Sequence, residues 1–358
     1  MEVTFEKIRE ALSFVVEPDL KKDIIALDLV SNIEFQGGKV RFNLKISNPA
    51  MHNRKRMEEA CEHHLKRFLG NEITVEVNVS AMGKAHERAP EHRNILPGVK
   101  HIIAVASGKG GVGKSTVSAN LAAGLAKKGY KVGLIDADIY GPSVPAMFDV
   151  SNEKPQTINI EGKEYIKPVE SHGVKMLSIG FFSTPDQAVV WRGPMATKAL
   201  TQLFKDAYWG ELDYMIVDLP PGTGDVHLTL VQQVPLTGAI VVSTPQEIAL
   251  VDVRKALGMF SLPQINVPVL GLVENMAYFT PKELPDNKYY IFGQSGAKDL
   301  ADRMNIKYLA EIPLVQSIRE AGDAGRPAVL QENTPQAQAF DQLVEQIILL
   351  IEKPKKST

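Results

Sequence analysis

Cysteine is nearly absent from this sequence. Cys61 is the only cysteine among 358 residues, which excludes an intrachain disulfide and leaves the redox environment open. Long hydrophobic runs are also missing, since no apolar stretch approaches the roughly 18 residues that span a bilayer. The opening residues MEVTFEKIRE contain acidic side chains and lack the basic and apolar regions of a signal peptide. We therefore expect a cytoplasmic protein with no membrane partner.

An excess of charge of either sign is lacking as well. Lys and Arg number 40 against 42 Asp and Glu, which gives a formal net charge of -2. Such a balance produces no overall field that would attract nucleic acid, and we expect no nucleic-acid partner. What the chain does have is typical of globular proteins: 44% hydrophobic residues, 23% charged residues and a length that allows two or three domains with a sizeable core.

Residues 1–80 predict a small α+β domain. Apolar residues recur at helical spacing in 4–15 and in 53–69, whereas they alternate with polar residues in 39–47 and in 72–80, as in half-buried strands. The next stretch, 81–98, is polar, contains prolines and shows no period. It is therefore the predicted linker.

Residues 99–352 predict a doubly wound α/β domain with a parallel sheet, followed by a polar tail at 353–358. Short, wholly apolar runs such as HIIAVAS and YMIVDLP are typical of parallel strands buried on both faces. Helical stretches such as STVSANLAAGLAKKG fall between these runs. The apolar stripe within 340–351 favours a helix packed on the sheet over a helix lying on a membrane, because the polar face carries acids rather than a basic stripe.

The segment SGKGGVGKST at 107–116 predicts a phosphate-binding loop. It completes the pattern G-x-x-x-x-G-K-[ST] directly after an apolar strand and directly before a helix. Glycines at these offsets leave backbone N–H groups free to converge on an anion. We expect Lys114 to contact the β and γ phosphates of ATP, Ser115 to ligate Mg²⁺, and Thr116 to lie near the α phosphate. The predicted nucleotide-binding residues of the loop are Gly108, Lys109, Gly110, Gly111, Val112, Gly113, Lys114, Ser115 and Thr116.

The second lysine of this loop, Lys109, needs a separate explanation. It cannot share the phosphate oxygens of Lys114 without like-charge repulsion, so we expect its side chain to point outward. An outward lysine beside a nucleotide needs an anion from elsewhere, and the simplest source is the nucleotide of a second copy of the chain. This predicts a face-to-face homodimer bridged by ATP, in which Lys109 acts in trans as a catalytic charge together with Lys114.

Polar residues at the ends of other apolar runs supply the rest of a nucleotide site. Asp136 and Asp138 are candidate catalytic carboxylates that orient water, although helix capping or turn chemistry would also explain them. Asp218 ends the run YMIVD, where a carboxylate can hold Mg²⁺ through water, and the loop PPGTG after it is suited to sensing a γ phosphate. Asn275 is a candidate reader of a purine edge or a simple turn residue. Without a dedicated strong base, we expect slow hydrolysis.

These residues together resemble a known family. GKGGVGKST is similar to the phosphate loop of the MinD, ParA and nitrogenase iron protein class, in which the early lysine crosses the dimer interface. Within that class, DADIYGPSVPAMF, VWRGPM, LVENM and IPLVQSIREAGDAGRPAV resemble the Mrp/ApbC family of ATP-binding iron–sulfur cluster carriers. The region EPDLKKDIIALDLVSNIEFQGGKVRFNL resembles the small domain often fused to these carriers. The resemblance implies an iron–sulfur cluster as cargo, with iron–sulfur assembly proteins and client apoproteins as partners.

The sequence departs from that family at the expected cluster ligands. The resemblance implies a C-x-x-C pair after the ENM motif, contributed by each subunit to a bridging cluster. Here the segment reads NMAYFTPKELPDNKYYIFG, without cysteine. Cys61 is a candidate iron–sulfur ligand, but its place on an apolar helical stripe favours an inert buried thiol. The neighbouring histidines of CEHH point in different directions on a helix, and the cluster formed by His86, His92 and His101 is more typical of a polar tract.

Three functions are compatible with this reading. The first is an ATPase dimer that binds or transfers iron–sulfur clusters. The second is an ATP-switched scaffold that assists cluster assembly without ligating a cluster, in which FTPKELPDNKYYIFG would be a partner-binding loop. The third, a nucleic-acid partitioning protein, is disfavoured because no basic patch is present. We expect the first.

Overall fold

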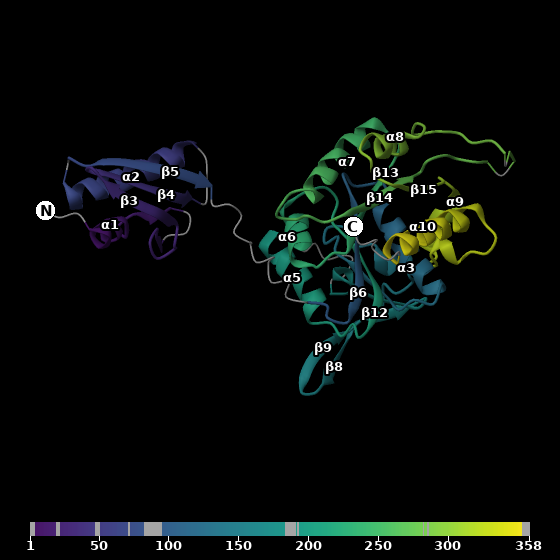
Figure 1. Cartoon of the computed structure of the whole chain (residues 1–358). Coiled ribbons are helices and arrows are strands. Elements are labelled where there is room, and N and C mark those ends of the chain that lie inside the picture. Colours follow the sequence, from purple (N-terminus) through teal and green to yellow (C-terminus); the bar gives the residue numbers. More distant parts are fainter. Residues whose placement is uncertain are drawn as a thin grey trace. The chain divides into compact units, whose positions relative to one another are not determined.

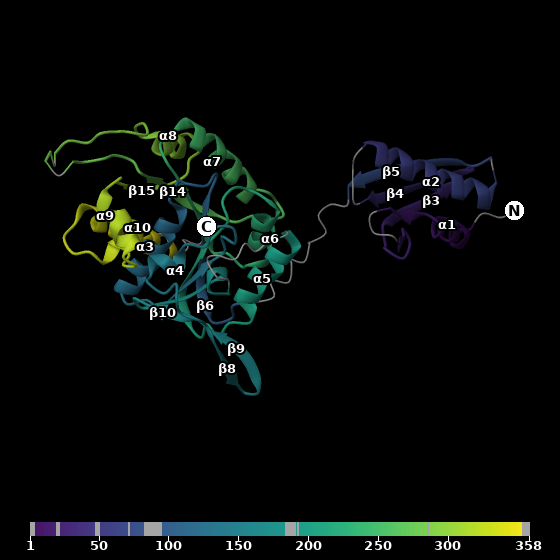
Figure 2. The same ribbon diagram turned by 180° about the vertical axis from the view of Figure 1, so that it is seen from behind.

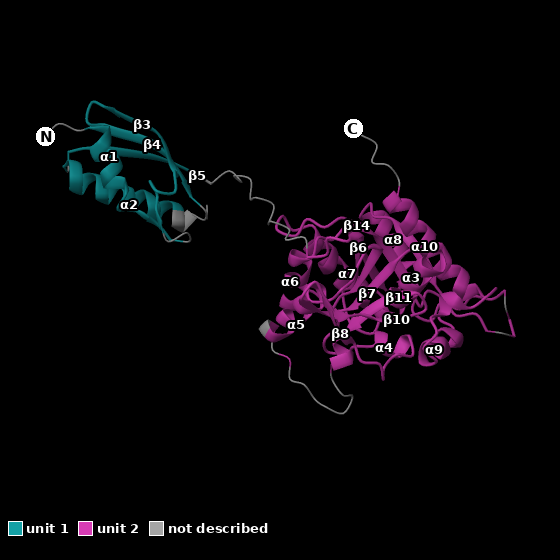
Figure 3. Ribbon diagram, turned by 90° about the horizontal axis from the view of Figure 1, so that it is seen from below, with its two compact units in different colours: residues 1–91 teal, residues 92–358 magenta. Residues whose placement is uncertain are grey.

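The computed structural model describes residues 4–18, 22–46, 51–70, 72–81, 95–182, 191, 193–281, 283–284 and 286–352. The chain forms two compact units, residues 1–91 and residues 92–358 (Figure 3). Most of the expected linker, 82–94 with His86 and His92, lies outside the described residues, as does the whole expected tail, 353–358.

Unit 1 is built on a three-stranded sheet in the order β3-β4-β5. β3 and β4 are antiparallel and are joined at Gly37 and Gly38, whose φ angles of 59° and 78° suit a tight hairpin turn. β4 and β5 are parallel, and α2 forms the crossover that parallel strands require. The elements are α1 (Phe5–Leu12), β1 (Val16–Glu17), β2 (Lys22–Asp23), β3 (Val30–Gln36), β4 (Lys39–Ile46), α2 (Met51–Leu69) and β5 (Thr74–Ala81).

Unit 2 is built on a sheet that has eight strands in the described residues, in the order β10-β11-β7-β12-β6-β13-β14-β15. All neighbouring pairs are parallel except β10 and β11. The predicted doubly wound α/β fold is confirmed. The strands are β6 (Val99–Ser107), β7 (Val132–Asp136), β10 (Val169–Ser171), β11 (Val174–Ser178), β12 (Leu212–Asp218), β13 (Gly238–Ser243), β14 (Val269–Asn275) and β15 (Tyr308–Ile312).

Helices cover both faces of this sheet, as Figures 1 and 2 show, and each face has its own apolar core. This arrangement explains why the central strands are apolar on both sides. One face carries α5 (Gly193–Lys205), α6 (Asp225–Gln233), α7 (Glu247–Phe260) and α8 (Gly296–Arg303). The other carries α3 (Lys114–Lys127), α4 (Val144–Met147), α9 (Gln316–Asp323), the 3₁₀ turn η2 (Ala328–Leu330) and α10 (Pro335–Glu352). A further 3₁₀ turn, η1 (Ile179–Phe182), follows β11.

The C-terminal helix α10 packs on the sheet, with Phe340, Leu343 and Ile347 fully buried. Its last residue, Glu352, accepts hydrogen bonds from the hydroxyls of Tyr130 and Tyr214 at 2.9 and 3.2 Å. No helix in the described parts of the chain combines the length and apolarity needed to cross a bilayer.

Two segments extend from the body of unit 2 (Figures 1 and 2). One is the hairpin of β8 (Gln156–Ile160) and β9 (Lys163–Lys167). Its side chains are mostly exposed, so its sequence lacks the apolar runs by which the other strands are recognised. The other is the segment between β14 and α8, which includes the expected partner-binding loop.

Candidate nucleotide site

The phosphate loop lies at the carboxyl end of β6, in the middle of the sheet, and leads directly into α3. Gly113 caps α3 with a φ of 82°, a left-handed conformation that glycine adopts without strain. A Cβ at this position would also lie 2.1 Å from Nδ2 of Asn275. The first-turn N–H groups of α3 have no partners within the helix, so they are available to an anion above the loop.

Lys114, the first residue of α3, is 94% buried and paired with Asp218 at the end of β12. Its Nζ lies 2.8 Å from Oδ2 of Asp218, and its side chain is 6% exposed. The Ser115 and Ser118 hydroxyls each donate to this carboxylate at 2.6 Å, to Oδ2 and Oδ1 respectively. The structure thus brings together the predicted phosphate-binding lysine and the two predicted magnesium-binding residues.

Asp136 and Asp138 differ in their surroundings. Asp136 is fully buried, and its carboxylate accepts hydrogen bonds from the backbone N–H groups of Asp138, Ser143 and Val144 and from the Ser178 hydroxyl. Burial, followed by the nearby charge of Asp218, raises the pKa of Asp136. Through these contacts Asp136 holds the turn that follows β7.

Asp138 remains at the nucleotide site. Its side chain is 15% exposed, and its Oδ2 lies 3.8 Å from Nζ of Lys114. Burial raises the pKa of Asp138 although the Lys114 ammonium opposes the shift. A carboxylate in this place can accept a hydrogen bond from a water molecule beside the phosphates.

Lys109 is half-buried, and its ammonium forms no ion pair with any carboxylate among the described residues. Its carbonyl accepts a hydrogen bond from the Ser107 hydroxyl at 2.9 Å. The preceding Gly108 lies against the backbone of α7, where a Cβ would come within 2.3 Å of the Asp252 carbonyl carbon. Gly110 and Gly111 are exposed, and Val112 is buried in the core.

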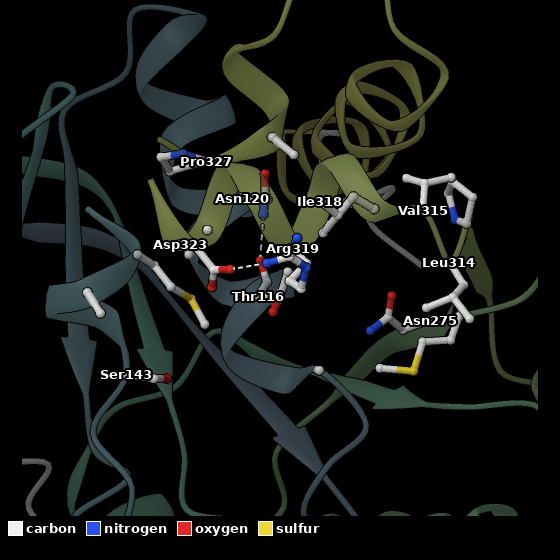
Figure 4. Close-up of a pocket in the computed structure, with 18 residues that line it drawn as sticks. Thr116, Asn120, Ser143, Asn275, Leu314, Val315, Ile318, Arg319, Asp323 and Pro327 are labelled. Atoms are coloured by element: carbon white, nitrogen blue, oxygen red, sulfur yellow. Dashed lines mark hydrogen bonds and ion pairs between the residues drawn. The ribbon is translucent and has the colours of Figure 1, made fainter. Parts of the chain in front are cut away.

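A cavity of about 350 Å³ opens beside the phosphate loop (Figure 4). Its lining includes Gly113 and Thr116 at the phosphate loop and Ile318 and Arg319 of α9. Arg319 is held by an ion pair with Asp323 on the same helix. The sequence reasoning gave no role to α9, although the segment IPLVQSIREAG was part of the resemblance.

Asn275 lies between the cavity and the loop. Its Nδ2 donates to the carbonyl of Val112 at 2.8 Å, and the residue is 6% exposed. One N–H of the Asn275 amide therefore holds the phosphate loop, and the second N–H and the amide oxygen remain for contact with a base.

Comparison with known proteins decides the family. The model described as NUBPL iron-transfer P-loop NTPase matches residues 98–348, and the model described as iron-sulfur cluster assembly protein matches residues 6–79. A protein of Synechocystis named iron-sulfur cluster carrier protein is 43% identical over 346 residues, which are 96% of this chain and 97% of that protein. The chain belongs to the NUBPL iron-transfer P-loop NTPase family. The resemblance to the cluster carriers is confirmed.

Two further relatives of this P-loop NTPase support the assignment. The iron-sulfur cluster transfer protein NUBPL of Dictyostelium discoideum is 44% identical over 272 residues, 75% of this chain and 82% of that protein. A solved structure of a nucleotide-binding protein from Archaeoglobus fulgidus, in complex with ADP, has a TM-score of 0.59 and 38% identity. It covers 70% of this chain and 96% of its own.

Unit 1 of this P-loop NTPase buries its thiol. Cys61 is 0% exposed in the core of unit 1, and burial raises its pKa to about 12. Thiolates rather than thiols bind iron, so this position is unfavourable for a ligand. His63 and His64 lie edge to face, and His101 packs on Tyr214. Within the described ranges no three His, Cys, Asp or Glu side chains gather in a way that could hold a metal.

The segment after β14 also has an ordered core. Phe279 and Tyr289 pair as an antiparallel bridge with two backbone hydrogen bonds of 2.8 Å. The Lys288 ammonium lies 3.8 Å from the centre of the Tyr278 ring. Tyr289, Tyr290 and Ile291 are exposed, by 45%, 40% and 59%. This loop therefore presents apolar and aromatic surface.

Proposed function

We propose that this chain is a slow ATPase that works as an ATP-bridged homodimer and delivers iron–sulfur clusters to apoproteins in the cytoplasm. The observation that carries the proposal is the buried ion pair of Lys114 and Asp218, to which the half-buried Ser115 hydroxyl donates. It occurs in a chain whose nearly full length matches proteins named as cluster carriers. The runner-up is an ATP-switched scaffold.

The residues present fit Mg·ATP. Hard divalent cations take oxygen ligands, and the Ser115 hydroxyl and Asp218 carboxylate are adjacent oxygen donors. The first-turn N–H groups of α3 and the Lys114 ammonium would hold the β and γ phosphates. Mg²⁺ would neutralise charge that develops on the phosphates. Thr116 lies on the cavity wall next to the loop, consistent with a place near the α phosphate, and the adenosine would occupy the cavity under α9.

Asp138 is the carboxylate that we assign to orienting the attacking water. Asp136 already accepts from four donors, so it is better suited to holding the 138–144 turn. Burial raises the pKa of Asp138, but no histidine among the described residues hydrogen-bonds to its carboxylate, and this supports slow turnover.

Lys109 supports the dimer. Its ammonium has no anionic partner among the described residues, and a nucleotide phosphate of a second subunit would supply one. We expect Lys109→Ala to bind one ATP per chain, to remain monomeric by light scattering with ATP, and to lose hydrolysis. Lys298→Ala, which removes an exposed lysine of α8, is the matched control. Unchanged turnover in Lys109→Ala would contradict the trans role.

The cargo requires sulfur ligands from outside the chain. A homodimer contains two cysteines in total, one per chain, and each Cys61 is buried. Four-thiolate ligation by the homodimer alone is therefore excluded, and a client, an assembly partner or a small thiol must complete the cluster. The observation that supports the scaffold alternative is the exposure of Tyr289, Tyr290 and Ile291 in the loop where the family's cysteines are expected.

Iron and acid-labile sulfide per chain, measured after anaerobic reconstitution with and without added glutathione, separate these functions. The carrier predicts stoichiometric iron and sulfide when the thiol is present, and equal loading of Cys61→Ala. If no condition loads the protein, the scaffold is the better description. If Cys61→Ala abolishes loading, Cys61 is a ligand after all.

A further inference from the structure

A histidine that the sequence reasoning did not single out lies behind the nucleotide site. His227 in α6 is 1% exposed, and its ring packs near the Phe260 ring of α7 at 6.0 Å between centroids. Its Nδ1 lies 3.1 Å from the carbonyl oxygen of Pro220. A carbonyl can only accept, so Nδ1 carries the proton and donates. Nε2 is buried without a hydrogen-bond partner among the described residues.

The loop that His227 contacts has few ways to be held. It connects Asp218, the partner of Lys114, to α6, and it contains Pro220 and Pro221, which have no N–H group. Only the residues on either side can donate from the backbone. Leu219 N–H donates to Val105, and Gly222 N–H donates to the Ser107 carbonyl at the start of the phosphate loop, both at 3.0 Å.

The hydrogen bond from His227 is a third contact of this loop, in addition to those made by Leu219 and Gly222. Leu219 and Gly222 tie the two ends of the proline pair to β6 and the phosphate loop, while His227 ties the middle to α6. Pro220 is buried, so its carbonyl would lose its partner in a dry environment if the imidazole were removed. The loop would then be free to move between its two ends.

We propose that His227 is a positioning residue for ATP hydrolysis: its Nδ1–H group fixes the Pro220 carbonyl and thereby holds Gly222 against the phosphate loop. Only the ATP turnover measurement described below rests on the proposed ATPase function. Burial, and then the Lys114 charge, lower the pKa of His227 to about 4, so the ring is neutral and keeps this donor arrangement near pH 7. His227 acts through the loop rather than on the phosphates.

The substitutions can separate the hydrogen bond from the packing. His227→Phe keeps a ring beside Phe260 and removes the donor. His227→Asn places an amide N–H at the same δ position as the imidazole N–H, and so restores the donor without the ring. His101→Phe is the control, because His101 is a half-buried ring on β6 that packs on Tyr214.

The first readout is hydrogen exchange of the full chain without nucleotide, followed on the peptide that covers 219–226. We expect His227→Phe to exchange there about tenfold faster, a factor typical of one lost hydrogen bond. β12 and α7 should exchange as in the wild type. The Asn variant and His101→Phe should match the wild type in the loop. Equal protection in the Phe variant, or equal acceleration in the Phe and Asn variants, would overturn the proposal.

The second readout is steady-state ATP turnover. We expect kcat of the Phe variant to fall about tenfold with KM for ATP within about twofold, since the loop and not the binding cavity is disturbed. The Asn variant should recover most of kcat. A parallel change of kcat and KM in both variants would show a merely structural residue. If the wild type does not hydrolyse ATP, the proposed function fails while the exchange experiment still decides the role of His227.

Discussion

Gly108 provides a sharp test of how the phosphate loop is supported. Its Cα lies so close to α7 that a Cβ would come within 2.3 Å of the Asp252 carbonyl carbon and 2.6 Å of the Val253 nitrogen. Ordinary contacts of a Cβ begin near 3.4 Å. The atoms that it meets belong to a helix backbone, which cannot rotate away as a side chain can. Gly108→Ala must therefore displace the loop or α7 by about 1 Å.

The expected cost follows from this overlap. Overpacking of a tight interior typically costs about 1–3 kcal/mol, and we expect the upper part of that range because backbone must move. For a unit of this size each kcal/mol lowers the melting temperature by roughly 2–4 °C, so a cost of about 2–3 kcal/mol should lower it by roughly 4–12 °C. Gly110→Ala is the matched control, because nothing lies within 4 Å of its Cβ position and its φ is outside the left-handed region.

Tryptophan fluorescence during thermal unfolding measures this effect in unit 2 alone. Both tryptophans of the chain, Trp191 and Trp209, belong to that unit. We expect a lower transition for Gly108→Ala and a wild-type transition, within about 2 °C, for Gly110→Ala. Equal transitions for the two variants would refute the claim that the loop rests directly on α7.

Three further predictions concern charges and the thiol. Lys114→Met should abolish ATP binding in calorimetry and destabilise unit 2 by about 3–5 kcal/mol, because Asp218 is left buried without its cation. Adding Asp218→Asn should restore stability but not ATP binding. Restored ATP binding would contradict the assignment of Lys114 to the phosphates. Burial lowers the pKa of His227 from 6.5 to about 4, so between these pH values the unfolded chain binds a proton that the folded chain rejects. Acidification from pH 6.5 to 4 should thus lower the free energy of unfolding, measured by urea titration, by about 3 kcal/mol more in the wild type than in His227→Phe. If the free energies of unfolding of the two proteins change in parallel with pH, this prediction is wrong. Burial raises the pKa of the Cys61 thiol to about 12, so this thiol should react with a disulfide reagent only as fast as unit 1 opens. If the native protein reacts as fast as free cysteine, the thiol is accessible.

The sequence predicted the parts of the fold that depend on burial on two faces. The runs that became β6, β7, β12, β13 and β14 are apolar because helices cover both sides of the sheet. The β8–β9 hairpin and the short strand β10 were not predicted, since exposed strands carry no such run. The hydrophobic pattern of a sequence reflects which residues are buried, and few residues of these strands are buried.

The site was predictable where its residues form one contiguous motif. The phosphate loop could be read from spacing, but Asp136 and Asp138 looked equivalent at the end of one strand. What distinguishes them is distant in sequence, because Ser178 of β11 donates to Asp136 and not to Asp138. His227 had no signal either, since its partner is a backbone carbonyl, which leaves no trace in residue types.

The anchoring of Glu352 has a practical consequence for measuring dimers. Tyr214 lies near the start of β12 and Tyr130 just before β7, so α10 ends at the amino edge of the parallel sheet. The phosphate loop and Lys109 lie at the carboxyl edge. A fluorophore or surface tether joined after Glu352 therefore starts from the edge of the sheet opposite the phosphate loop, where it can report association of two chains without standing between their phosphate loops.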